Sequence, residues 1–71
     1  MNTKEQGLNT PMDVLRRALE KEQQAFEFYS DLLNQTRVRM LQDLLSTLKD
    51  EEQKHVKMIQ NKIAELNLGR G

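Results

Sequence analysis

The 71-residue sequence contains no cysteine, which excludes both a disulfide framework and a thiolate zinc site. It also lacks any apolar run near the roughly 18 residues of a membrane-spanning helix, and its first nine residues lack the apolar centre of a secretory signal. The 11 lysines and arginines equal the 11 aspartates and glutamates in number, so the basic surplus typical of nucleic-acid binding is missing too. We therefore expect a soluble, cytoplasmic protein that binds neither membrane nor nucleic acid.

One proline and three glycines are too few to interrupt the chain often, and helical periodicity dominates it. The first helix has a clear start signal. Thr10 is a good N-cap, Pro11 suits the first helical position, and Asp13 favours the positive helix end. Nothing after this signal breaks a helix before about Asn34. The sequence NQT at 34–36 is the one loop-like stretch in the middle of the chain.

The second predicted helix runs from about Arg37 to Leu66, with Thr36 as its candidate N-cap and Gly69 as its terminator. A loop this short makes the two helices antiparallel. Two helices cannot enclose a core, so the sequence predicts an all-α hairpin that dimerises into a four-helix bundle or forms a higher even-numbered homo-oligomer. We expect three segments: a flexible N-terminal tail at 1–9, the helical hairpin at 10–67 and a C-terminal tail at 68–71.

Polar residues at inward positions interrupt the apolar stripes of both helices. At about 100° per residue, Glu22 lies at the centre of the apolar face of the first helix, close to Leu15. Glu52 and His55 lie inside the Leu and Ile stripe of the second helix. With the turn centred near residue 37, Glu22 is level with Glu52, and His55 is less than one turn away. The three polar side chains are therefore predicted to converge.

Convergence of these three side chains predicts a metal site, because buried ionised carboxylates are costly unless they are paired or bound to a cation. Twofold symmetry would double the set of two carboxylates and one imidazole, which suits two divalent ions. A Glu-x-x-His pair that faces a Glu on a neighbouring helix is the ligand pattern of di-iron and di-manganese carboxylate bundles. Oxygen-rich ligands with imidazole favour iron or manganese, and zinc is a candidate substitute.

Each of these residues has a plainer interpretation that the sequence leaves open. Glu22 could pack its stem while its head reaches water, and Glu52 and His55 could hydrogen-bond across a dimer and set its register. Glu51 lies on the border of the stripe, so we interpret it as a surface residue. Its position four residues before His55 nevertheless makes it a candidate additional ligand. Tyr29 is interpreted equally as core packing or as a residue that acts at the site.

The stretches ALEKEQQAFEFYSDLL and LQDLLSTLKDEEQKHVKMI resemble the ferritin-like superfamily, specifically rubrerythrins and encapsulated ferritins. The resemblance is carried by Glu22, by Tyr29 seven residues later, and by Glu52 and His55 in the motif EQKH. It implies that Glu22, Glu52 and His55 bind iron, with Glu52 as a candidate bridging ligand. It also implies that Tyr29 hydrogen-bonds to a ligand carboxylate. Because this chain carries the unit once, the resemblance implies a dinuclear site formed between two chains, which oxidises Fe(II) with oxygen or peroxide.

Three features depart from these families. A cysteine-rich segment for electron delivery is missing, the C-terminal ELNLGRG does not resemble an encapsulin-targeting tail, and the chain is short for an encapsulated ferritin. We therefore expect a ferritin-like four-helix bundle with ferroxidase-like activity, and the tail does not support an encapsulin shell as a partner. The alternatives are a rubrerythrin-like peroxide scavenger with an external reductant and a metal-free helical interaction module.

Overall fold

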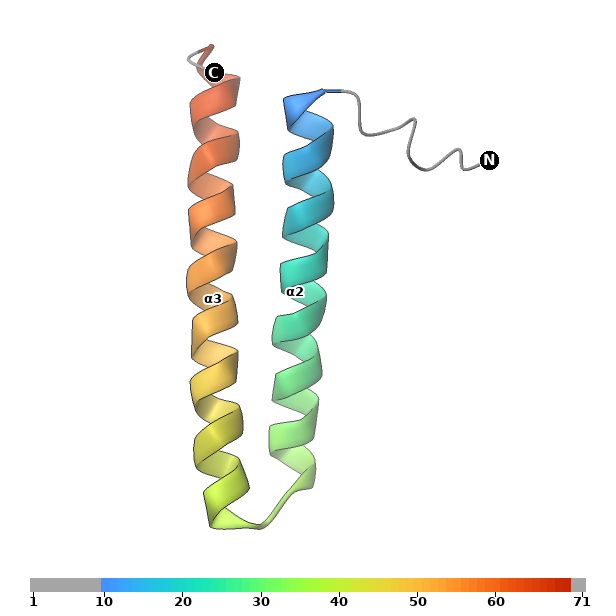
Figure 1. The fold of residues 1–71 in the computed structure, drawn as a ribbon, viewed down its shortest axis with the longest axis vertical. Helices are drawn as coiled ribbons and strands as arrows, with labels where there is room; N and C mark the ends of the chain where they lie inside the picture. The colour runs from blue at the N-terminus through green and yellow to red at the C-terminus, as the bar shows by residue number, and fades with distance from the viewer. Residues whose placement is uncertain (1–9, 70–71) are drawn as a thin grey trace, which may run out of the picture.

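The computed structural model describes residues 10–69, which form two antiparallel α-helices joined by a short loop at 36–38 (Figure 1). Helix α2 covers Pro11–Gln35 and helix α3 covers Arg39–Asn67. The predicted all-α antiparallel hairpin is therefore confirmed. The predicted N-terminal tail at 1–9 and the last two residues of the predicted C-terminal tail lie outside the described residues.

The predicted start of α2 is confirmed in detail. The backbone N–H of Asp13 donates to Thr10 Oγ1 at 3.1 Å, and Thr10 itself has the extended backbone of an N-cap residue. Pro11 occupies the first turn, where its missing N–H costs nothing, and Asp13 adds an acidic side chain at the positive end of the helix. At the end of α3, which lies beside the start of α2, Gly69 has a φ of 80°, which a glycine adopts without strain (Figure 1).

The start of α3 differs from the sequence prediction. The helix begins at Arg39, two residues later than expected, and its N-cap residue Val38 provides no side-chain hydrogen bond. Thr36 Oγ1 instead accepts a hydrogen bond from the backbone N–H of Val38 at 3.2 Å. The hydroxyl group therefore shapes the loop and does not cap the helix, because threonine side chains bond readily to the backbone two residues on. The Gln42 side chain in the first turn of α3 also stabilises the loop, since its Nε2 donates a hydrogen bond to the Thr36 carbonyl at 3.1 Å.

The hairpin has no core of its own. Not one residue between 10 and 69 is fully buried, although the Leu, Ile and Phe stripes of α2 and α3 face each other and are half-buried. Both helices also carry large apolar side chains that remain exposed. We use the name open face for the side of the hairpin defined by five of them: Val14, Phe28, Met40, Leu44 and Met58.

These exposed residues share one side of the hairpin for geometric reasons. Measured from inward-facing Glu22, Val14 and Phe28 lie about 80° and 120° around α2. Measured from inward-facing Leu48, Leu44 and Met58 lie about 40° and 80° around α3 in the same rotational sense. Because the helices are antiparallel, the same sense leads to the same side of the hairpin. An apolar face of this kind on a hairpin without a core is typical of a subunit that packs against another helical surface. Among residues 10–69, neither helix has an apolar stretch long enough to cross a membrane.

Candidate metal centre

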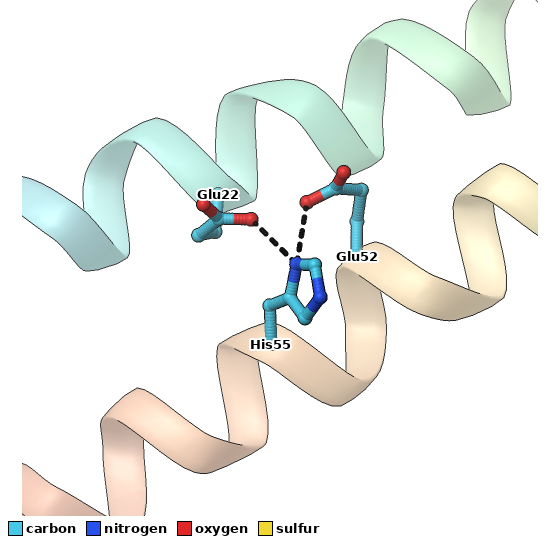
Figure 2. Close-up of side chains that lie close together, drawn as sticks. All are labelled: Glu22, Glu52 and His55. Carbon is cyan, nitrogen blue, oxygen red and sulfur yellow. Dashed lines mark hydrogen bonds and ion pairs between the residues drawn. The ribbon is translucent and has the colours of Figure 1, made fainter.

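The structure brings together the three residues that the sequence predicts as ligands. Glu22 projects from the middle of α2 toward α3, and Glu52 and His55 project from neighbouring turns of α3 toward α2 (Figure 2). One ligand atom of each lies within 4.8 Å of the others. We call these three residues the cluster. Residues three apart on a helix lie on the same face, so Glu52 and His55 present their side chains to the same point.

One nitrogen atom of the cluster lies close to both carboxylates. His55 Nδ1 lies 3.2 Å from Glu22 Oε1 and 3.4 Å from Glu52 Oε1 (Figure 2). The side chains are 50% exposed for His55, 30% for Glu22 and 18% for Glu52. The cluster is thus half-covered by its own hairpin. It adjoins a shallow hollow of about 330 Å³ that Glu22 and Glu52 line together with Phe28 of the open face.

One oxygen atom of the cluster lacks a hydrogen-bond partner. Glu52 Oε1 is buried and accepts no hydrogen bond. His55 Nδ1 is close to it, but a ring nitrogen carries at most one hydrogen, and the hydrogen bond from this nitrogen goes to Glu22 Oε1. A buried carboxylate oxygen without a donor is costly, and a cation at this point would remove that cost.

The three groups change one another's protonation. The neighbouring Glu52 carboxyl is the main cause that lowers the pKa of Glu22, and His55 adds to it. The neighbouring Glu22 carboxyl is likewise the main cause that raises the pKa of Glu52, and burial acts in the same direction. The hydrogen bond to Glu22 raises the pKa of the His55 imidazole. Because the pKa values of Glu52 and His55 are raised, protons would compete with a cation for these two groups, and the competition becomes stronger as the pH falls.

Because His55 is the single histidine of the chain, its NMR titration can be read without ambiguity. In the metal-free protein we expect its pKa to lie above the ordinary value of about 6.5, because protonated His55 is bonded to Glu22. Glu22→Gln should move the pKa back toward the ordinary value. A pKa unchanged by Glu22→Gln would show that this hydrogen bond does not form in solution.

The same shifts determine how the cluster affects stability in the metal-free protein. The contribution of His55 is fully present below its unfolded pKa and is lost as the pH rises through its raised folded pKa. The contribution of Glu22 is present above its unfolded pKa and is lost as the pH falls through its lowered folded pKa. The contribution of Glu52 is fully present below its unfolded pKa and is lost as the pH rises through its raised folded pKa.

Two further residues named from the sequence lie outside this group. Glu51 is exposed and supplies no atom to the cluster. Tyr29 is half-buried and packs edge-on against Phe28, with ring centroids 5.5 Å apart, and no hydrogen bond joins it to the cluster within residues 10–69. Its role at the site stays a prediction. Lys49, one turn before Glu52, makes a contact across the hairpin that the sequence did not predict, since its Nζ lies 5.5 Å from the centroid of the Phe26 ring.

The donor set of the cluster fits a divalent transition metal. Two carboxylates and an imidazole nitrogen converge, and Glu52 Oε1 is already desolvated and free of any donor. A hairpin that presents Glu on one helix and Glu-x-x-His on the next has the ligand arrangement of ferritin-like di-iron carboxylate bundles.

A sequence model described as Rubrerythrin matches residues 13–71, and the chain therefore belongs to the rubrerythrin family of the ferritin-like superfamily. The family binds a pair of iron ions. No significant match was found among curated proteins or solved structures.

Proposed function

We propose that two copies of this hairpin pair through the open face to form a di-iron carboxylate protein that oxidises Fe(II) with oxygen or peroxide. The observation that carries the proposal is the convergence of Glu22, Glu52 and His55, with a buried donor-free oxygen, on a hairpin that matches the rubrerythrin family. Glu22, Glu52 and His55 of both copies would hold the two ions.

Pairing is supported by what one hairpin lacks. A dinuclear carboxylate site of this class takes one Glu from each of two helices and Glu-x-x-His from each of two others, and one hairpin supplies half of this set. The hairpin also leaves the open face exposed and buries no residue completely within 10–69. A second copy would supply the missing ligands and cover the apolar surface at the same time.

In this proposal the side chains bind the ions, orient them and move protons. Glu52, the least exposed of the three residues, and Glu22 would hold the ions through carboxylate oxygens. His55 would bind through Nδ1, the nitrogen that already faces both carboxylates. Because the neighbouring Glu22 carboxyl and burial raise the pKa of Glu52, a proton would compete with a cation for this carboxylate. Iron held by these ligands would supply one-electron redox chemistry, which the side chains alone cannot perform.

A melting experiment tests the metal site. The protein, purified without chelator, should contain iron, and Fe(II), Mn(II) or Zn(II) should each raise the melting temperature. A cation that binds only the folded dimer stabilises it by about 2.7 kcal/mol at a concentration one hundred times its dissociation constant. This stabilisation should disappear at acid pH, because the ligands must lose their protons to bind.

Two outcomes of this experiment would change the conclusion. An unchanged melting curve with all three metals would favour the metal-free interaction module. If metal binds, rates of Fe(II) oxidation with oxygen and with peroxide separate the two activities. Preference for oxygen indicates ferroxidase work, and strong preference for peroxide indicates a peroxide scavenger. The scavenger would draw its electrons from an external reductant, since the chain contains no cysteine-based electron carrier.

A further inference from the structure

Two exposed methionines lie on the open face at different distances from the cluster. Met58 is 65% exposed and follows His55 by three residues on α3. Met40 is 72% exposed and precedes Glu52 by twelve residues. At about 1.5 Å per residue, Met58 is about 4.5 Å from His55 along the helix axis, and Met40 is about 18 Å from Glu52. Side chains in a helix lean toward its N-terminus, so that of Met58 leans toward the turn of His55.

We propose that Met58 is a modification site, where hydrogen peroxide from Fe(II) oxidation forms methionine sulfoxide that weakens the pairing of the hairpins. This inference rests on the proposed function. Two Fe(II) ions each give one electron to oxygen, which takes up two protons and becomes hydrogen peroxide. The sulfur lone pair of Met58 then bonds to one peroxide oxygen as the O–O bond breaks. The sulfur is oxidised by two electrons, and the other oxygen leaves as water.

The modification acts on pairing because of where Met58 lies. The thioether contributes apolar surface to the open face, and oxidation replaces it with a polar, chiral sulfoxide. A sulfoxide oxygen that is buried between two helical surfaces without a donor costs free energy. Peroxide that accumulates at the cluster would thus separate the two half-sites and stop further Fe(II) oxidation.

Met40 provides an internal control for this inference. In a single hairpin Met40 is at least as exposed as Met58, and both lie on the face that pairing would cover, so peroxide added to bulk solution should oxidise both to a similar extent. Peroxide formed at the cluster reaches Met58 first. After aerobic Fe(II) oxidation with catalase present to remove bulk peroxide, peptide mass spectrometry should show several-fold more sulfoxide at Met58 than at Met40. The metal-free protein treated with added hydrogen peroxide should show similar amounts at both.

A second measurement tests the effect on pairing without metal. Met40→Leu keeps Met58 on the open face, whereas the double variant Met40→Leu/Met58→Leu keeps neither methionine there, and both are treated with hydrogen peroxide in the metal-free state. Sedimentation should show that treated Met40→Leu dissociates, whereas the treated double variant stays paired.

Three outcomes are informative. Equal sulfoxide at Met58 and Met40 during turnover, or equal dissociation of the two oxidised variants, overturns the inference. If Fe(II) is oxidised normally and Met58 stays unmodified, the inference fails and the proposed function stands. If the protein neither binds nor oxidises Fe(II), both fail.

Discussion

His55→Ala and Glu52→Ala should each remove bound metal while the hairpins remain paired. Loss of a supporting residue near a metal costs roughly 10–100-fold in affinity, and loss of a ligand from a set this small should cost more. The fold should survive, because His55 is half exposed in the hairpin and its removal leaves no internal cavity. Metal content by elemental analysis and mass by sedimentation measure the two effects separately.

Three further variants extend this experiment: Glu20→Ala and Glu51→Ala serve as comparisons outside the cluster, and Glu22→Leu tests the third proposed ligand. Glu20→Ala changes an exposed residue of α2 and should leave metal binding unaltered. Glu51→Ala should also keep the metal, and loss of metal in this variant would add Glu51 to the ligand set. Glu22→Leu should lose metal, because it removes one of the two carboxylates of the cluster. Unchanged iron stoichiometry in Glu22→Leu would show that Glu22 is not a ligand.

Leu44→Glu should separate the paired hairpins into unstable monomers. Leu44 is 52% exposed in a single hairpin, so a carboxylate there would cost little if the protein were monomeric. Between two paired hairpins the same carboxylate would be buried without a partner, at a cost of several kcal/mol for each ion. Since no residue within 10–69 is fully buried in one hairpin, loss of pairing should also reduce helix content.

Ser46→Glu is the matched control, because Ser46 is exposed and points to the opposite side of α3 from Leu44. Sedimentation equilibrium and circular dichroism should show a wild-type mass and melting temperature for Ser46→Glu. A wild-type mass and melting temperature for Leu44→Glu as well would exclude the open face as the pairing surface.

Much of the hairpin could be predicted from local patterns. Thr10, Pro11 and Asp13 mark the start of α2 because capping and helix-end electrostatics depend on neighbouring residues only. The start of α3 could not be located in the same way. The Thr36 hydroxyl accepts from the Val38 N–H and does not cap α3, because the path of the loop between the two packed helices decides which N–H it meets.

The sequence by itself determined that Glu22, Glu52 and His55 point inward at one level, because helical periodicity sets the angle of each residue and a short loop sets the register. Only the tertiary structure decided which atoms meet: His55 Nδ1 lies against both carboxylates, and Glu52 Oε1 is left buried without a donor. It also showed which apolar residues the hairpin leaves uncovered. Side-chain rotamers and the rotation of α2 against α3 control these features, and both depend on packing between residues that are distant in the sequence.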